Sequence, residues 1–220
     1  MQYIFSEEAG LESLVINGDL YKYLVKVRRF KEGDEVSFRN LKDDCLYNYF
    51  IKNISRKELF LTKKEKIFKK NPLEKELEIF WCVIDPKTIE KTLPFLNQIG
   101  VKKITFVYCD RSQKNFRLDF EKFKKIVINS NQQSGRVHIM EFELKKSLKE
   151  IIENHKDLAV LDFGGSERFD GIKKVLIGCE GGFTEVEKIL MKDHLKIAFS
   201  TKNILKSETA AVAISSKLLI

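Results

Sequence analysis

The sequence predicts a mostly parallel α/β domain preceded by a small β-rich unit, and three observations carry this prediction. Residues 1–70 contain short segments in which apolar and polar residues alternate, as in antiparallel strands. The charged stretch 63–70 runs into Asn71-Pro72, where proline breaks regular structure. From residue 77 onward, near-continuous apolar runs alternate with helical patterns, which is typical of a parallel sheet covered on both faces. We therefore place one domain at 1–70 and another at 71–220.

The first domain is expected to be a strand-rich recognition module. Residues 19–27 place Leu20, Tyr23, Leu24 and Val27 at the i, i+3, i+4, i+7 spacing of one helix. Short alternating runs flank this helix, and their close spacing suggests antiparallel strands closing into a small barrel. No acid–base constellation appears among them. The expected strands are 3–5, 14–16, 35–39, 45–54 and 58–62.

The second domain is expected to alternate strands with helices. One helix ends at Gly100, a typical C-cap residue, and contains Pro94, which should kink the helix or delay its start. The last helix begins with an alanine-rich apolar segment and should be largely buried. The expected strands are 77–84, 103–109, 137–140, 158–163, 174–178 and 195–199, and the expected helices are 88–99, 120–130, 144–154, 185–193 and 207–220.

The composition describes a soluble, cytoplasmic, globular protein. Hydrophobic residues make up 43% and charged residues 33% of the 220 positions, which suffices for a core. No apolar run approaches the roughly 18 residues of a membrane span, and the N-terminus lacks the pattern of a signal peptide. The four cysteines and three histidines lack the paired spacing of zinc ligands. We therefore expect no membrane partner, no metal site and no disulfide framework.

The charge balance favours a polyanionic partner. The chain carries 40 basic and 32 acidic residues, a net charge of +8. Residues 20–31 hold five basic side chains and no acid, and residues 111–125 hold six against two acids. Such runs commonly form solvated faces. Here they are interleaved with aromatic residues, which favours nucleic acid as the partner.

The most specific stretch is 175–187. An apolar run leads into a loop with Gly178, Gly181 and Gly182, and Thr184 and Glu187 then form a capping box that opens a helix. Backbone N–H groups at such a junction can face a ligand. The alternative is an ordinary strand-to-helix turn that needs a positive φ twice.

Three loops follow predicted strands at the sheet edge where open α/β sheets bind ligands: 162–167, 178–182 and 200–207. Three loops suited to one pocket are stronger evidence than one. The motifs G-x-x-x-x-G-K-[ST], G-x-G-x-x-G and G-x-S-x-G are absent. A glycine pocket without phosphate-binding lysines suits a ligand held by main-chain bonds, such as an adenosine without a phosphate chain.

The motifs resemble one known family. Ile177-Gly-Cys-Glu-Gly-Gly-Phe-Thr-x-x-Glu187 resembles the I-G-P-E-G-G-[FL]-[ST]-x-x-E signature of the RsmE family of ribosomal RNA uridine-N3 methyltransferases, in the SPOUT superfamily. The segment 203–210 is similar to its R-[IV]-L-R-x-E-T-A element, and Gln133-Ser-Gly-Arg136 to its E-Q-[SC]-G-R loop. Segments 26–29, 96–101 and 110–112 resemble further family segments, in the same order along the chain.

The resemblance implies a fold and an activity. It implies a PUA-like β-barrel at the N-terminus that helps hold ribosomal RNA, and a C-terminal SPOUT domain with a trefoil knot. Rules for chain connections alone argue against a knot. It further implies a homodimer that uses S-adenosylmethionine to methylate a specific uridine at N3 of 16S ribosomal RNA, either free or in the small ribosomal subunit.

The same resemblance assigns residues to roles. The cofactor would contact Leu161, Phe163, Gly164, Ile177, Gly178, Glu180, Gly181, Gly182, Phe199, Ser200, Thr201, Ile204 and Leu205. RNA would contact Lys22, Lys26, Arg28, Arg29, Arg111 and Arg136.

The chain departs from the family pattern at several of these positions. Cys179 replaces the signature proline, Asn203 replaces the first arginine of the second element, and Lys206 replaces the second arginine. Thr201 stands where the family has glycine, and Gln132 where it has glutamate. Lysine keeps the charge of arginine but loses its two-pronged donor. An RNA-binding protein that has lost turnover, or that modifies a different RNA position, therefore stays open as the alternative.

The catalytic hypothesis names two residues. Methylation at N3 requires alignment, stabilisation of charge on the base and a proton acceptor. We assign the stabilisation to Lys206 and the proton to Glu208, directly or through the groups it orders. Three alternatives stay open: Glu208 as a residue favoured by the helix dipole, Lys206 as a phosphate contact, and Glu180 as a third candidate.

Overall fold

The computed structural model describes residues 2–70 and 74–220 and divides into two compact units. The first comprises Met1–Pro72 with Asn131–His138, and the second Leu73–Ser130 with Ile139–Ile220. The boundary predicted at Asn71-Pro72 lies outside the described residues. The segment 131–138, which we placed in the second domain, groups with the first unit, because the backbone N–H of Gln2 donates to the carbonyl of Gln132 at 2.8 Å.

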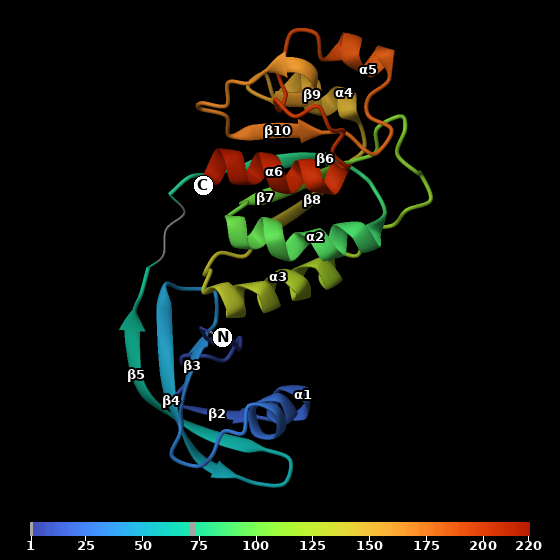
Figure 1. The fold of residues 1–220 in the computed structure, drawn as a ribbon. Coiled ribbons are helices and arrows are strands. Elements are labelled where there is room, and N and C mark those ends of the chain that lie inside the picture. The colour runs from blue at the N-terminus through green and yellow to red at the C-terminus, as the bar shows by residue number, and fades with distance from the viewer. Residues whose placement is uncertain (1, 71–73) are drawn as a thin grey trace. The chain divides into compact units, whose positions relative to one another are not determined.

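The first unit is built on a mixed five-stranded sheet in the order β1-β3-β4-β5-β2 (Figure 1). Its strands are β1 Ile4–Phe5, β2 Ser13–Ile16, β3 Glu35–Arg39, β4 Cys45–Ile54 and β5 Leu59–Phe68. The pairs β3–β4, β4–β5 and β2–β5 are antiparallel as predicted, whereas β1 pairs with β3 in parallel. β5 is longer than predicted because its charged end stays paired with β4 as far as Phe68, opposite Cys45.

The helical segment of this unit differs from the predicted amphipathic α-helix. It consists of a short α1, Gly18–Tyr21, followed by a π-helix η1, Lys22–Val27. Within η1 the backbone N–H of Arg28 donates to the carbonyl of Tyr23 at 2.9 Å, the i to i+5 bond of a π-helix. The wider turn removes Val27 from the buried face, so Leu24 is buried while Val27 is 66% exposed.

The second unit is built on a six-stranded sheet in the order β11-β9-β10-β6-β7-β8 (Figure 1). Every pairing among these described strands is parallel, which confirms the predicted sheet type. The strands are β6 Glu78–Cys82, β7 Lys103–Val107, β8 Glu141–Lys145, β9 Ala159–Ser166, β10 Lys174–Ile177 and β11 Leu195–Ile197.

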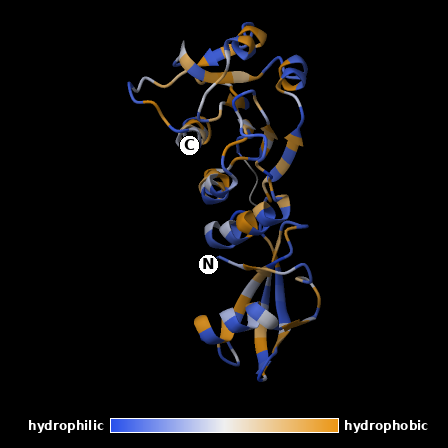
Figure 2. Ribbon diagram, turned by 90° about the vertical axis from the view of Figure 1, so that its right-hand side faces the viewer, coloured by the Kyte–Doolittle hydropathy of each residue, from blue (hydrophilic) through white to orange (hydrophobic). Residues whose placement is uncertain are grey.

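The helices of this unit are α2 Pro86–Ile99, α3 Phe120–Ser134, α4 Leu148–Asn154, α5 Glu185–Leu190 and α6 Ser207–Leu219. α2 begins directly at Pro86, because the Asp85 carboxylate caps it by accepting from the N–H of Thr88 at 2.9 Å. Of the kink or late start predicted from Pro94, the late start does not occur. Helices here carry hydrophobic and hydrophilic residues side by side (Figure 2). None of the described helices has the length and apolarity that crossing a bilayer requires.

Two strands of this unit differ most from their predicted bounds, and the others differ by one or two residues at an end. The strand predicted at 137–140 lies instead at β8, because Lys103 of β7 pairs in register with Glu141 and forms an ion pair with Glu143 at 2.7 Å. The helix predicted from residue 144 accordingly starts at Leu148. β9 continues to Ser166, so the loop predicted at 162–167 is mostly strand.

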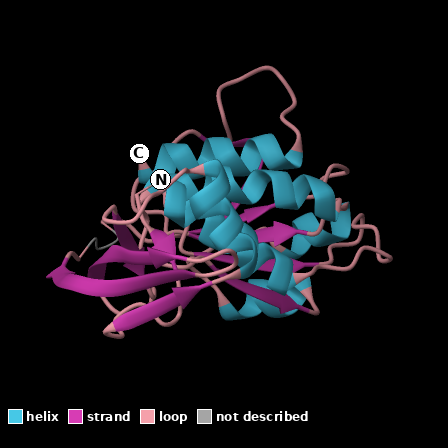
Figure 3. Cartoon of the chain, turned by 90° about the horizontal axis from the view of Figure 1, so that it is seen from below, coloured by secondary structure: helices cyan, strands magenta, loops and turns pink. Residues whose placement is uncertain are grey.

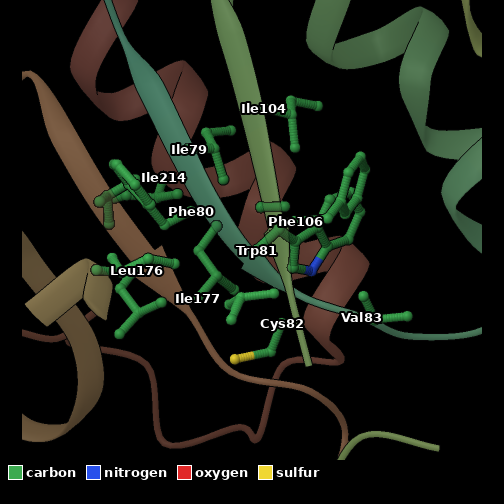
Figure 4. Packing of buried hydrophobic residues seen from close by; sticks show 14 of the residues in the cluster. Ile79, Phe80, Trp81, Cys82, Val83, Ile104, Phe106, Leu176, Ile177 and Ile214 are labelled. Carbon is green, nitrogen blue, oxygen red and sulfur yellow. The ribbon is translucent and has the colours of Figure 1, made fainter. Parts of the chain in front are cut away.

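Helices cover both faces of the parallel sheet (Figure 3). Neighbouring residues of β6 point to opposite faces, as strand geometry requires. On one face the Phe80 ring lies 4.7 Å from the ring of His155, which follows α4. On the other, Trp81 stacks with Phe106 at 6.0 Å and donates a hydrogen bond to Ser207 of α6. Figure 4 shows Phe80, Trp81 and Phe106 among the buried side chains that pack around β6.

Candidate active site

A cavity of about 430 Å³ lies where the neighbouring strands β9, β10 and β11 end. Because these strands are adjacent and parallel, their carboxyl ends meet at one edge of the sheet, as predicted for the three segments. The lining residues are Leu161, Asp162, Phe163, Gly164, Ile177, Gly178, Cys179, Glu180, Gly181, Gly182, Phe183, Ala198, Phe199, Thr201, Asn203, Ile204, Leu205, Ser207 and Ala210.

The glycine loop after β10 forms a tight turn. The N–H of Gly182 donates to the carbonyl of Cys179 at 2.9 Å, and Gly182 has a φ of +66°, a left-handed conformation that favours glycine. Gly178 packs closely but without strain: a Cβ there would lie 3.4 Å from the Cα of Gly182, an ordinary van der Waals contact. The loop therefore requires a positive φ at one glycine, not at two as in the simple turn considered as the alternative.

Arg111 braces this loop. Its guanidinium donates a hydrogen bond to the carbonyl of Gly181. A Cβ at Gly181 would lie 3.0 Å from the Cδ of Arg111, so glycine is what allows the arginine to pack there. The residue predicted to contact RNA thus also holds one wall of the cavity.

Glu187 ties the same wall to the turn after β7. The predicted capping box is present: Thr184 accepts from the N–H of Glu187 at 3.3 Å, and Glu187 accepts from the N–H of Thr184 at 2.8 Å. The other carboxylate oxygen of Glu187 accepts from the N–H of Asp110 at 2.8 Å. Asp110 in turn accepts from the Thr184 hydroxyl at 2.9 Å. At 4% exposure, Glu187 is a buried carboxylate whose function is to hold these backbone donors.

Ser207 links the cavity to the core of the sheet. Its hydroxyl accepts from the indole N–H of Trp81 at 2.8 Å and donates to the carbonyl of Gly178 at 2.5 Å. Both Trp81 and Ser207 are buried. The first residue of α6 is therefore fixed against the glycine loop, with Lys206 and Glu208 on either side of it.

The wall contributed by the segment after β11 is held differently. Within this segment, the backbone N–H of Asn203 donates a hydrogen bond to the Thr201 hydroxyl at 3.1 Å. Ile204, which lines the cavity, is 82% exposed. The segment is anchored just before this stretch, where a Cβ at Gly165 of β9 would lie 2.5 Å from the backbone of Ile197.

The charge of the lining suits a neutral or cationic ligand. The charged side chains that line the cavity are Asp162 and Glu180, both acidic. Asp162 is paired with Lys196 at 3.2 Å. A phosphate would face these carboxylates without a lysine or arginine in the lining, whereas a sulfonium or ammonium group is favoured beside them. Within the described residues, no cluster of His, Cys, Asp and Glu suits a metal ion.

The cavity brings together every predicted cofactor residue except Ser200. The proposed catalytic residues Lys206 and Glu208 flank the lining but do not belong to it: Lys206 is exposed at the N-cap of α6, and Glu208 is half-buried in its first turn. Seven further residues line the cavity. Asp162, Cys179, Asn203 and Ser207 lie in the three loops predicted to form the pocket, whereas Phe183, Ala198 and Ala210 lie outside them. The small residues Ser207 and Ala210, three apart on one helix face, were a signal that could have identified that face.

Besides Arg111, which braces the glycine loop, the predicted RNA residues fall into two groups. Lys22, Lys26, Arg28 and Arg29 are all exposed on the helical segment of the first unit, where Lys22 pairs with Asp19 at 2.9 Å. Arg136 is 8% exposed, and its guanidinium donates to the carbonyl of His138 at 2.9 Å. Burial lowers the pKa of Arg136 to about 10. Its position favours a structural role over a phosphate contact.

Two family models match the chain. An RNA methyltransferase domain matches residues 69–219, and an RNA methyltransferase PUA domain matches residues 16–64. Among curated relatives, ribosomal RNA small subunit methyltransferase E of Helicobacter pylori strain J99 is 37% identical, with 98% of each chain covered. The Aquifex aeolicus protein of the same name is 26% identical over 100% of this chain and 99% of its own.

Solved structures share the fold. Ribosomal RNA small subunit methyltransferase E from Neisseria gonorrhoeae, bound to S-adenosylmethionine, superposes with a TM-score of 0.81 at 15% identity, covering 99% of this chain and 96% of that one. A Legionella pneumophila protein in complex with the same cofactor gives a TM-score of 0.82 at 20% identity, with the same coverage.

Proposed function

We propose that this chain, which belongs to the family of ribosomal RNA small subunit methyltransferase E, transfers a methyl group from S-adenosylmethionine to N3 of a specific uridine in 16S ribosomal RNA. The observation that carries the proposal is the glycine-walled cavity at the ends of three adjacent parallel strands, with two acidic residues in its lining. Both family models, covering the PUA and the methyltransferase domain, support it as well.

The cavity fits the cofactor. Its volume of about 430 Å³ lies within the roughly 300–1,000 Å³ of small-molecule sites. Apolar side chains such as Phe199 and Leu205 suit an adenine ring, and the carboxylates of Asp162 and Glu180 suit a ligand with positive charge. When bound, S-adenosylmethionine supplies an electrophilic methyl group on its sulfonium sulfur.

The chain's own residues would position the base and move its proton. Lys206 would place a positive charge beside the uracil, which becomes electron-rich as N3 loses its proton. Glu208 would accept that proton directly or order the group that does. Ser207, held between Trp81 and Gly178, fixes the backbone from which both side chains extend.

RNA would be held by the exposed basic residues of the first unit. Lys22, Lys26, Arg28 and Arg29 present positive charge on one short helical segment, which suits the phosphate backbone. The substrate would be 16S ribosomal RNA or the small ribosomal subunit, and the protein would act in the cytoplasm, where these are assembled.

A homodimer would complete the second unit. Phe163 and Ile204 line the cavity yet are 70% and 82% exposed, so apolar surface lies open beside the site. A second copy of the chain would cover it. Light scattering on the purified chain tests this, and a monomeric mass at micromolar concentration would contradict it.

We also place the SPOUT trefoil knot in residues 159–210. The close packing of Gly165 against the backbone of Ile197, with β11 outside β9, supports this. A crystal structure traced through this segment tests it: an unthreaded path would exclude the knot.

Calorimetry and methyl incorporation test the activity. The chain should bind S-adenosylmethionine and methylate a uridine in small-subunit RNA or assembled subunits, mapped by mass spectrometry. Lys206→Ala and Glu208→Ala should each slow methyl transfer by about 100-fold while cofactor affinity stays within about twofold, since neither lines the cavity. Full transfer rates in both variants would refute the assignment of these residues. Cofactor binding without incorporation into any substrate would instead identify an RNA-binding protein that has lost turnover.

A further inference from the structure

Three buried cysteines gather at the ligand-binding edge of the sheet. Cys82 ends β6, while Cys109 and Cys179 each follow two residues after the ends of the flanking strands β7 and β10. The sulfur atoms of Cys109 and Cys179 are 3.4 Å apart, and β6 is the strand between the two strands that they follow. Figure 4 shows the Cys82 sulfur at the end of β6, beside Ile177.

This pair is more than core packing, because one member opens onto the cavity. Cys179 lines the cavity and is 6% exposed, whereas Cys109 is 1% exposed behind it. The family signature has proline where this chain has Cys179, so the thiol at this position is a departure of this chain from the signature. The two residues are also far apart in sequence and come from different strands, so a bond between them would join two loops.

We propose that Cys109 and Cys179 form a redox modification site, at which hydrogen peroxide converts the two thiols into a disulfide. The sulfur of Cys179 attacks one peroxide oxygen, the O–O bond breaks, and water leaves as Cys179 becomes a sulfenic acid. The sulfur of Cys109 then attacks the Cys179 sulfur, the S–O bond breaks, and a second water leaves. In total, two thiols are oxidised to one disulfide, and one hydrogen peroxide is reduced to two waters.

The surroundings of Cys109 favour the second step. Hydrogen bonds with Cys179, Cys82 and Ser112 lower the pKa of the Cys109 thiol below its ordinary value. The Ser112 hydroxyl lies 3.2 Å from the Cys109 sulfur. Cys179 keeps its proton more strongly, because its hydrogen bond with Cys109 and burial both raise its pKa. Cys179 is the thiol that the oxidant can reach, and because it holds its proton, its reaction with peroxide is the slower step. Cys109 is the better nucleophile for the second step.

The disulfide would reshape the cofactor wall, a consequence that rests on the function proposed above. The sulfur–sulfur distance must fall from 3.4 Å to about 2.05 Å, which pulls Cys179 toward the turn after β7. Gly178 and Glu180 flank Cys179 and line the cavity, and Gly182 is bonded to its carbonyl at 2.9 Å. We expect oxidation to weaken S-adenosylmethionine binding by about tenfold or more, and a reductant to restore it.

The test treats the reduced full-length chain with hydrogen peroxide and then removes the excess. Titratable thiols should fall from four to two, the intact mass should drop by about 2 Da, and peptide mapping should find Cys109 linked to Cys179. Calorimetry should show weaker cofactor binding, reversed by dithiothreitol. Cys109→Ser should bind cofactor like the wild type before peroxide treatment and should keep that affinity afterwards. Cys45→Ala, which removes the buried cysteine of the first unit, should remain as sensitive as wild type.

Two outcomes would overturn the proposal. A mass gain of about 16 or 32 Da on Cys179 without a cross-link would show that Cys109 does not resolve the sulfenic acid. If the Cys109–Cys179 disulfide forms but cofactor affinity is unchanged, the disulfide does not reshape the cofactor site. If the reduced chain binds no S-adenosylmethionine at all, the proposed function fails. Disulfide formation between Cys109 and Cys179 can then still be tested by mass spectrometry.

Discussion

The two walls of the cavity are built in opposite ways. The loop after β10 is bonded on three sides, by Arg111 to Gly181, by Glu187 to the turn after β7, and by Ser207 to Gly178. The segment after β11 has an internal bond between Asn203 and Thr201, and Ile204 within it is 82% exposed. One wall is therefore fixed in advance by hydrogen bonds to neighbouring elements, while the other is left to be ordered by whatever occupies the cavity.

This difference separates two contributions to ligand affinity. Changes in the bonded wall should alter the stability of the fold and the affinity together, because the same bonds serve both. Changes in the exposed wall should alter affinity alone. Four substitutions test this contrast, in order of decreasing expected effect.

Glu187→Ala should have the largest effect. It removes the buried carboxylate that accepts from the part-buried N–H groups of Asp110 and Thr184, and a hydrogen bond to a charged group contributes about 1.5–3 kcal/mol. We expect the free energy of unfolding in urea to fall by about 3 kcal/mol, and cofactor affinity to fall by more than about tenfold. Glu185→Ala is the matched control: Glu185 lies in the same helical turn and pairs with Lys188 in solvent, so both quantities should stay unchanged. Equal effects of the two substitutions would contradict the bracing role.

Ser207→Ala should come second. The indole N–H of Trp81 and the carbonyl of Gly178 lose a shared partner, at a cost of about 2 kcal/mol in unfolding free energy. Trp81 is the single tryptophan of the chain, so its fluorescence emission should shift in the variant. Ser216→Ala, on the same helix, should leave the emission unchanged. An unaltered spectrum in Ser207→Ala would show that the hydrogen bond between Trp81 and Ser207 is not formed in solution.

Arg111→Ala should have a smaller effect, of about 1 kcal/mol on unfolding, because its hydrogen bond to Gly181 is made at the surface. Cofactor affinity should fall by about threefold to fivefold. Arg117→Ala, whose guanidinium bonds to carbonyls of its own loop, provides the control. If Arg111→Ala weakens RNA binding but not cofactor binding, its role is confined to RNA.

Ile204→Ala should be the mildest for the fold. Since the side chain is exposed, unfolding free energy should change by less than about 0.5 kcal/mol. Cofactor affinity should nevertheless fall by about threefold, through lost apolar contact. In hydrogen exchange, amides of 200–206 should gain protection on cofactor addition, while those of 178–184 should change little. Equal gains in both segments would remove the contrast between the walls.

Sequence patterns predicted the cavity because the residues that shape its glycine loop interact with neighbours only a few positions away. The glycines of 178–182 and the pair Thr184 and Glu187 act within a few residues, and their capping box formed as expected. The strand ends that meet at the cavity followed from sheet type alone. What the sequence could not supply were partners distant along the chain, such as Arg111 for Gly181 or Asp110 for Glu187.

The prediction errors have the same origin. The register of β8 is set by pairing between Lys103 and Glu141, and no local pattern encodes it. Val27 fits an α-helical face but is turned outward by the π-helix. Segment 131–138 was predicted to be a polar loop and the start of a strand in the second domain, yet its contacts with residues near the N-terminus assign it to the first unit.

The contact of Gly165 with Ile197 makes the order of assembly matter. β11 is the last strand of the chain and sits at the edge of the sheet against β9, where any side chain larger than hydrogen at position 165 would strike its backbone. Residues lining the cavity reach as far as Ala210, so the site exists only once this final strand has docked. Competence to bind should therefore arise only when the C-terminal segment docks, a step that also completes the core, since Ile197 and Ile214 are fully buried in it.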